Sequence, residues 1–299
     1  PAMKDEGYDP DYSAALASAA SLLGPMIPPS ITLIVYAGLT DASVQKLFLA
    51  TLTPAVACTV AFLVYTLWYG KKKNLPKQPK KTLKEAGKIM LDAIWALLLP
   101  VIVLGLIFSG ITTVTEAAAI SCLYSAIVSL FIYKTITFKD LLKILGDSAV
   151  SIAAIMILVG MSKATAYVVI SSQMPQLFMG FITSFTSSRF VVLLILNLIF
   201  LLLGCLMEGN CIIVMMVPLL LTLVKSFGID LLQFGVMAAI NIYIGCITPP
   251  VGVSLLLGSK LGKTSIGGTF KAILPFLGIS MVILILVTYW PSFTLWLIH

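Results

Sequence analysis

Two proline pairs, Pro28-Pro29 and Pro249-Pro250, each interrupt an apolar stretch of the chain. Proline lacks a backbone N–H and clashes with the preceding turn, so two adjacent prolines unwind a helix. Inside a bilayer, carbonyls released in this way are costly unless they face protein, water or an ion. The freed carbonyls and the C-terminal helix ends are suitable ligands for a cation, whereas N-terminal helix ends attract anions. The pattern therefore predicts an ion site at each break.

Oxygen-only ligation favours a hard cation, and we expect Na⁺ bound by backbone or side-chain oxygens. The expected Na⁺ ligands are Gly24, Ile27, Gly204, Asn241, Gly245, Thr248 and Gly252, and the structural breaks are Pro28, Pro29, Pro249 and Pro250. Ser30, Glu208 and Asn210 are expected to bind substrate. A carboxylate between apolar runs is costly, so Glu208 either lies near cation or substrate or reaches water at a turn.

The elements that must position these residues are membrane helices. The 299 residues are 60% hydrophobic and 10% charged, with a mean hydropathy of +1.08, which excludes an ordinary soluble domain. The formal charge of +7 comes mainly from lysines in short loops, as expected beside lipid headgroups and unlike a nucleic-acid surface. No nucleophile–base set appears and the single His is the last residue, so no catalytic residues are expected and the protein is not expected to be an enzyme. The prediction is an all-α polytopic membrane protein.

Lysine distribution orients the predicted spans. The basic loop 70–88 is placed in the cytoplasm, which puts Asp41 outside. The stretch 190–224 is interpreted as a re-entrant hairpin with its tip at 204–210, because Lys260 and Lys263 then lie inside; a full crossing is the alternative. The expected uninterrupted spans are 43–69, 89–111, 117–133, 148–170 and 265–290.

Residues 7–54 recur at 228–275 with a constant offset of 221. Gly7 matches Gly228, Asp9 matches Asp230, Gly24 matches Gly245, each Pro-Pro pair matches the other, and Pro54 matches Pro275. With the predicted orientation, the first copy runs outward and the second inward. This is an inverted repeat, typical of secondary transporters with broken helices; two unrelated kinked helices are the alternative.

Four motifs resemble those of the large membrane subunit (M subunit) of the TRAP family, the tripartite ATP-independent periplasmic transporters, and their order along the chain makes the resemblance specific. They are Gly24-Pro-Met-Ile-Pro-Pro-Ser-Ile31, Gly7-Tyr-Asp-Pro10, Thr115-Glu-Ala-Ala-Ala119 and Thr248-Pro-Pro-Val-Gly252. The sequence departs at Val114, where the family commonly has proline. The resemblance covers nearly the whole chain and implies the downstream two-thirds of a family member, with a first hairpin upstream.

What the resemblance implies is a sodium-coupled elevator in the bacterial inner membrane. A periplasmic binding protein would deliver an organic acid, such as sialic acid or a C4-dicarboxylate, and a small Q-type subunit, separate or fused, would enlarge the scaffold. The expected regions are the first broken helix in a transport domain (1–42), mainly scaffold (43–189), the second hairpin and broken helix of the transport domain (190–264), and a last span (265–299). The alternatives are a stand-alone Na⁺- or H⁺-coupled carboxylate carrier, and an intramembrane enzyme or channel.

Overall fold

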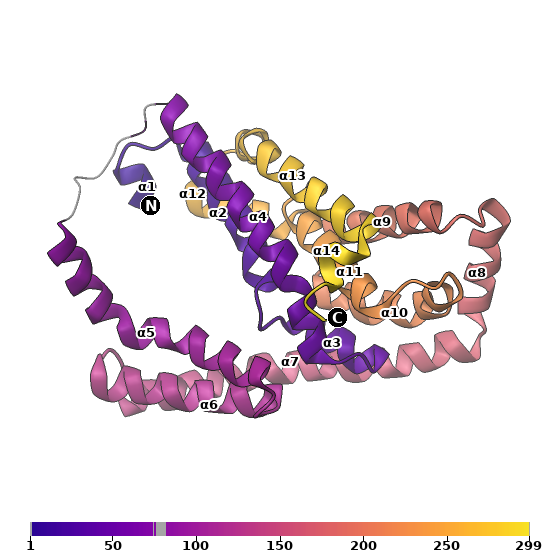
Figure 1. Cartoon of the computed structure of the whole chain (residues 1–299), viewed down its shortest axis with the longest axis horizontal. Helices are drawn as coiled ribbons and strands as arrows, with labels where there is room; N and C mark the ends of the chain where they lie inside the picture. Colours follow the sequence, from indigo (N-terminus) through magenta and orange to yellow (C-terminus); the bar gives the residue numbers. More distant parts are fainter. Residues whose placement is uncertain (1, 74, 76–81, 299) are drawn as a thin grey trace. The chain divides into compact units, whose positions relative to one another are not determined.

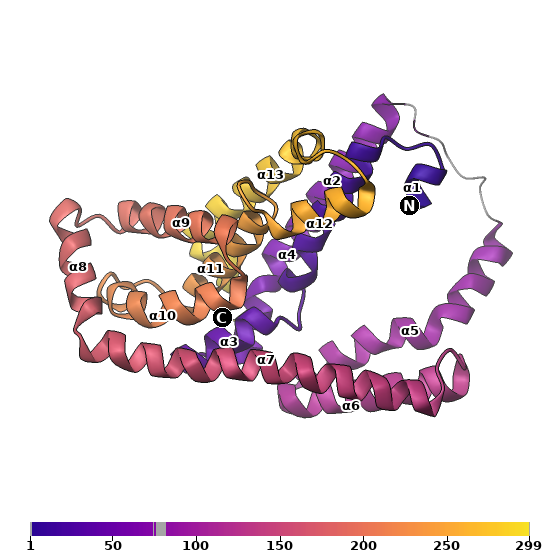
Figure 2. The ribbon, with the colours of Figure 1, turned by 180° about the vertical axis from the view of Figure 1, so that it is seen from behind.

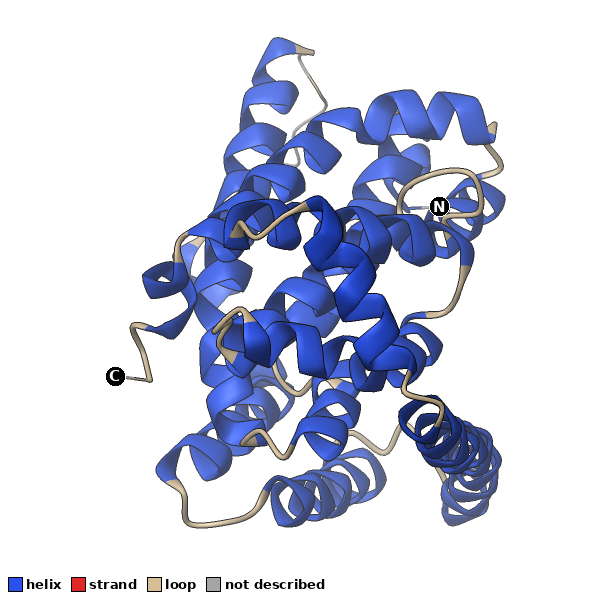
Figure 3. Cartoon of the chain, turned by 90° about the vertical axis from the view of Figure 1, so that its right-hand side faces the viewer, coloured by secondary structure: helices blue, strands red, loops and turns tan. Residues whose placement is uncertain are grey.

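The computed structural model describes residues 2–73, 75 and 82–298, and every regular element in these ranges is helical (Figure 3). Seven described segments are long and apolar enough to cross a membrane: Pro10–Thr40, Val44–Lys72, Gly87–Ser109, Val114–Ile132, Arg189–Leu206, Gly209–Ser226 and Ile266–Tyr289. The all-α, polytopic class is thereby confirmed. Part of the predicted basic loop, residues 74 and 76–81, lies outside the described residues.

The chain forms two compact units, residues 1–76 with 159–299, and residues 77–158. In the second unit, α5 (Leu83–Ser109) pairs with α6 (Val114–Ile127), which continues into a π-helical turn at Val128–Ile132. The Tyr124 hydroxyl donates to the Trp95 carbonyl at 2.7 Å, and Glu116 forms a capping box with Thr113. The long helix α7 (Phe138–Ser171) contains the expected span 148–170. The predicted boundary between scaffold and transport domain remains a prediction.

The first unit contains two broken helices with matching boundaries. The first consists of α2 (Pro10–Met26) and α3 (Ile31–Thr40), and the second of α11 (Leu231–Cys246) and α12 (Val253–Gly262). Asp9 caps α2 by accepting from the Asp11 and Tyr12 amides, and Asp230 caps α11 by accepting from the Leu232 and Gln233 amides. The bonds Pro28–Pro29 and Pro249–Pro250 are both cis. Both predicted breaks and their common surroundings are confirmed.

A long helix follows each broken helix. These are α4 (Val44–Lys72) and α13 (Ile266–Tyr289), with Pro54 and Pro275 at equivalent internal positions. The short helices α1 (Ala2–Asp5) and α14 (Pro291–Leu295) lie at the two ends of the unit's sequence. Stacked rings of Tyr12 and Tyr69, 4.0 Å apart, join α2 to α4. The repeat therefore extends over three helices in each copy.

The broken helices run antiparallel to each other, with α2 beside α12 and α3 beside α11 (Figure 2). On the first pair, Ala14 lies against Gly262, and the Ser18 hydroxyl donates to the Ser254 carbonyl at 3.1 Å. On the second pair, the Tyr36 hydroxyl donates to the Leu231 carbonyl at 2.6 Å. The end of α3 consequently lies beside the start of α11, and the two breaks lie next to each other.

A helical hairpin, α9 (Arg189–Leu206) and α10 (Gly209–Ser226), completes the unit after α8 (Met174–Phe185) (Figure 1). At its open end, the Tyr289 hydroxyl donates to the Phe190 carbonyl at 3.3 Å, and Gln233 at the start of α11 donates to the Val287 carbonyl at 3.0 Å. At its tip, Gly204 packs against Gly245 near the second break. The start of α9 and the end of α10 therefore lie on the side of Asp230, and the tip between the two helices meets the breaks.

Candidate functional site

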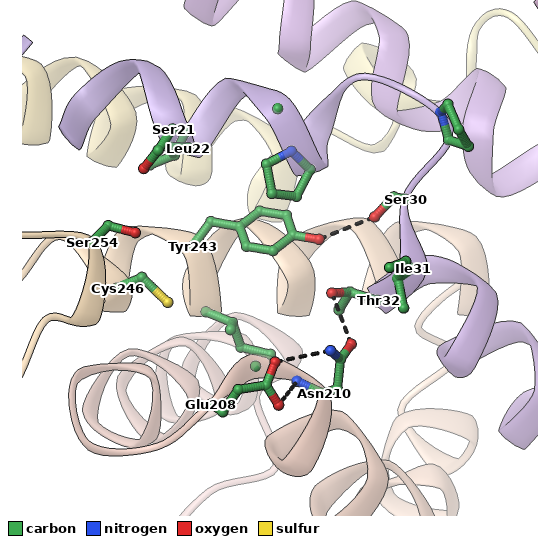
Figure 4. Close-up of a pocket in the computed structure, with 15 residues that line it drawn as sticks. Ser21, Leu22, Ser30, Ile31, Thr32, Glu208, Asn210, Tyr243, Cys246 and Ser254 are labelled. Atoms are coloured by element: carbon green, nitrogen blue, oxygen red, sulfur yellow. Dashed lines mark hydrogen bonds between the residues drawn. The ribbon is translucent and has the colours of Figure 1, made fainter. Parts of the chain in front are cut away.

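A cavity of about 490 Å³ lies where the two breaks and the hairpin tip meet (Figure 4). Its walls are the ends of five helices: the last turns of α2 and α11 and the first turns of α3, α10 and α12. The lining residues are Ser21, Leu22, Gly24, Pro25, Pro29, Ser30, Ile31, Thr32, Glu208, Gly209, Asn210, Ile242, Tyr243, Cys246 and Ser254. Both repeats and the hairpin contribute, so the cavity combines residues from three parts of the sequence that the antiparallel pairing brings together.

Polar side chains in the wall are linked by hydrogen bonds (Figure 4). The hydroxyls of Ser30 and Tyr243 lie 3.1 Å apart, and these residues are 1% and 7% exposed. The Thr32 hydroxyl donates to the Asn210 side-chain oxygen at 3.2 Å, and the Asn210 amide donates to the Glu208 carboxylate at 2.9 Å. These contacts connect α3 to α11 and to α10, and they hold hydroxyl and amide groups at the cavity surface.

Glu208 is the N-cap residue of α10 and directly precedes Gly209. Its carboxylate accepts from the backbone amides of Asn210 at 3.0 Å and Cys211 at 3.2 Å, while the side chain stays exposed at the cavity. A carboxylate is favoured there because the N-terminal amides of a helix carry partial positive charge. Glu208 is thus exposed at the hairpin tip and also lines the cavity, and whether it lies near a bound cation or substrate remains a prediction.

The structure brings together all three residues expected to bind substrate, Ser30, Glu208 and Asn210. Among the expected Na⁺ ligands, Gly24 also lines the cavity, whereas Ile27 is 41% exposed beside the first break. The other five, Gly204, Asn241, Gly245, Thr248 and Gly252, are not among the lining residues. The expected Na⁺ set is therefore divided between the first break and the contact of α9 with the second broken helix, and its role in binding Na⁺ remains a prediction.

The glycines at the second break have a packing role that is visible in the structure. A Cβ on Gly245 would lie 2.8 Å from the Cys205 backbone nitrogen, and a Cβ on Gly204 would lie 3.0 Å from the Ile242 carbonyl oxygen. Gly252 has a φ of +51°, and its amide donates to the Cys205 carbonyl at 3.3 Å. The Thr248 hydroxyl donates to the Ile244 carbonyl at 2.8 Å. These residues hold the hairpin tip closely against the second break.

Asn241 belongs to a polar cluster inside the bundle. It is 0% exposed, and its amide nitrogen donates to the Asn197 side-chain oxygen at 2.6 Å and to the Met237 carbonyl at 2.9 Å. The Asn197 amide in turn donates to the Thr288 hydroxyl at 3.1 Å. The Asn241 side-chain oxygen has no hydrogen-bond partner among the described residues. This cluster ties α9 to α11 and α13.

Sequence reasoning did not single out Ser21, Thr32, Tyr243, Cys246 or Ser254 as site residues. Tyr243 lies six residues before Pro249 in a mostly apolar stretch. A tyrosine hydroxyl so close to a break is the sequence signal that could have identified it as a site residue. Thr32 and Ser254 follow the breaks by only a few residues. The described lining contains one carboxylate, from Glu208, and no lysine or arginine. Among the described residues, no group of three His, Cys, Asp or Glu is arranged to hold a metal ion.

Comparisons with known proteins agree with this architecture. Residues 1–293 match the family described as "Tripartite ATP-independent periplasmic transporter, DctM component". The chain is 34% identical over 293 residues to the sialic acid TRAP transporter large permease protein SiaM of Vibrio cholerae, covering 98% of this chain and 69% of the relative. It is 36% identical to the C4-dicarboxylate TRAP transporter large permease protein DctM of Pseudomonas aeruginosa, with the same coverage. It is 33% identical to the isethionate TRAP transporter permease protein DctMQ of Oleidesulfovibrio alaskensis, covering 98% of this chain and 46% of the relative.

Proposed function

The chain belongs to the DctM family of tripartite ATP-independent periplasmic transporters, and from that premise we propose that it carries an organic acid anion inward with Na⁺. The family and the apolar segments identify a multi-pass protein of the bacterial inner membrane that is a transporter component rather than an enzyme. The observation that carries the proposal is the cavity between the two breaks, because it places helix ends of both charges around one space.

Coupling to Na⁺ is supported by the last turns of α2 and α11, which end at the cavity. The final carbonyls of a helix have no intrahelical partner and carry partial negative charge. Gly24 at the first break and Gly245 at the second occupy equivalent positions in these turns. We therefore assign one Na⁺ region to each break, with Gly24 and Ile27 at the first and Gly204, Asn241, Gly245, Thr248 and Gly252 at the second.

The relatives support partners of this kind. A binding protein in the periplasm would deliver the acid, and a small membrane subunit would assemble with the chain, since a TRAP transporter is tripartite by its name. One relative is a single permease protein named DctMQ, and this name joins the large subunit's name DctM to the letter Q of the small subunit. The proposed cargo is an organic acid because the relatives' names specify sialic acid, C4-dicarboxylate and isethionate.

A bare face on α2 supports a further hairpin packed against the first break. Ala17, Ser21 and Gly24 are exposed, whereas their equivalents in α11, namely Ala238, Ile242 and Gly245, are buried under α9. No described atom lies within 4 Å of a Cβ placed on Gly24. We propose that an upstream hairpin covers this face as α9 and α10 cover α11, and that the two hairpins and broken helices move together as the transport domain of an elevator.

The inverted placement of the repeats in the bilayer predicts a labelling pattern. In a variant without native cysteines, Asp41→Cys and Asp230→Cys should react with a membrane-impermeant thiol reagent from the periplasmic side, because the end of α3 lies beside the start of α11. Lys260→Cys should react only from the cytoplasm. Arg189→Cys, at the base of α9, should label with the first pair if the hairpin is re-entrant. Labelling of positions 41 and 230 from opposite sides would contradict the proposal.

Uptake in proteoliposomes tests the function itself. With the small subunit and the binding protein present, accumulation of a labelled organic acid should need an inward Na⁺ gradient and should collapse when K⁺ replaces Na⁺. The reason is that the proposed Na⁺ positions lie at the two breaks, whose helix ends form part of the wall of the cargo cavity. Omission of the binding protein is the control that separates the alternative: undiminished uptake without it would favour a stand-alone carrier. ATP-driven uptake without an ion gradient would contradict both.

A further inference from the structure

Three helix N-termini open into the cavity. Ile31 and Thr32 begin α3, Gly209 and Asn210 begin α10, and Ser254 lies in the first turn of α12. First-turn amides lack an intrahelical acceptor and favour negative charge. The positions are not equivalent, since Glu208 caps α10 with its own carboxylate, whereas no side chain caps α3 or α12.

We propose that Glu208 is a built-in carboxylate that fills one of these anion positions and thereby selects the cargo. The cavity then accepts an acid with one carboxylate and several hydroxyls, and it rejects an acid with a second carboxylate at the far end. This inference rests on the proposed function and specifies its substrate class.

The hydroxyl groups of the wall provide an independent observation. Ser30 and Tyr243 are both more than nine-tenths buried, line the cavity, and join their two hydroxyls by one hydrogen bond. That bond uses one of the two hydroxyl protons and leaves the other available for an acceptor on the cargo. Ser21 and Ser254 add hydroxyls from the facing ends of α2 and α12. Such a wall is suited to a polyhydroxylated chain, because a buried hydroxyl binds best where its donors and acceptors are matched.

The charge of the cavity wall discriminates between acids with one carboxylate and acids with two. The described lining contributes the Glu208 carboxylate and no basic side chain, so a second cargo carboxylate in the cavity would face a like charge without a partner from this wall. Like charges that are brought close together repel each other. A hydroxyl in the same place carries no charge and can donate to the Glu208 oxygens. One carboxylate of the cargo remains compatible with the uncapped starts of α3 and α12.

The test compares D-gluconate with D-glucarate, which differ only by a terminal CH₂OH in place of a carboxylate. Binding to the purified complete transporter is measured calorimetrically at saturating Na⁺. Wild type should bind gluconate at least about tenfold more tightly than glucarate, because a like-charge contact disfavours the diacid. Glu208→Gln, which removes the charge and keeps the size, should bring the ratio close to one. Glu208→Asp should keep the preference for gluconate.

Asp230→Asn is the matched control, because Asp230 caps α11 in the same way but lies outside the cavity lining. It should leave the ratio of the two affinities unchanged. The inference is overturned if wild type binds glucarate as tightly as gluconate, or if Glu208→Gln folds and retains the wild-type ratio. Should the Gln variant not fold, an Asp variant that loses the preference overturns it. Sodium-driven uptake with a preference for diacids would overturn this inference alone, whereas failure of Na⁺ to drive uptake of any acid would overturn the proposed function.

Discussion

Replacing Gly245 with alanine is expected to destabilise the protein by about 3 kcal/mol, at the upper end of the usual cost of overpacking. A Cβ there would lie 2.8 Å from the Cys205 backbone nitrogen, and backbone cannot rotate away as a side chain can. The α9 arm would have to move from α11 and take the hairpin tip with it. We expect a lower midpoint of thermal unfolding in detergent and loss of most uptake.

Gly278→Ala is the matched control, because a Cβ on that helical glycine meets no described atom within 4 Å. It should keep or slightly raise stability, since alanine has the higher helix propensity. Gly24→Ala adds a test of the upstream hairpin: in the complete transporter it should resemble Gly245→Ala if a hairpin covers that face. A Gly245→Ala protein with wild-type stability would show that α9 does not approach α11 so closely.

The second large effect is expected at the hydrogen-bonded pair of Asn197, which is half-buried, and Asn241, which is buried. Asn197→Leu and Asn241→Leu should each reduce stability by about 1–3 kcal/mol, because each removes the 2.6 Å hydrogen bond between the two side chains inside the bundle. The double variant should cost less than the sum of the two single variants, since both partners are then apolar. Thermal unfolding of the four proteins completes the double-mutant cycle. Strictly additive losses would contradict a direct coupling between the two side chains.

The same variants test whether Asn241 is a Na⁺ ligand. If its free side-chain oxygen coordinates the ion, Asn241→Leu should raise the Na⁺ concentration for half-maximal uptake, and Asn197→Leu should not. If the cluster only joins α9, α11 and α13, the two variants should have the same Na⁺ dependence as wild type. The outcome therefore assigns Asn241 either to the ion or to helix packing.

The sequence was sufficient to predict the breaks, because Pro28-Pro29 and Pro249-Pro250 remove backbone donors wherever they stand. The offset of 221 also paired Asp9 with Asp230, and the structure shows that these two residues cap α2 and α11. Span edges were less predictable: the segment expected from 117 begins at Val114, because Thr113 and Glu116 form a capping box. A capping box extends a helix beyond its apolar run, so hydropathy alone misses its start.

The roles of single residues could not be read from their types. A glycine near a break allows either an ion-facing backbone or a close helix contact, and only the position of α9 shows the contact at Gly204 and Gly245. The hydrogen bond of Asn241 to Asn197 was likewise not predictable, because the two residues are 44 positions apart and lie 2.6 Å from each other only in the fold. Tyr243 reaches the cavity because α3 lies beside α11, which depends on tertiary pairing rather than local pattern.

The antiparallel pairing has a consequence for the direction of transport. Because α2 packs against α12 and α3 packs against α11, a movement of one repeat past the other would break both sets of contacts. Such a movement would also destroy the cavity between the two breaks, which is the proposed chamber for the cargo. A change of access that preserves the chamber is then a movement of both repeats together, as in the proposed elevator. A cargo held in such a chamber would meet the same groups at either face of the bilayer, and the electrochemical gradients of cargo and Na⁺ would determine which way net flux runs.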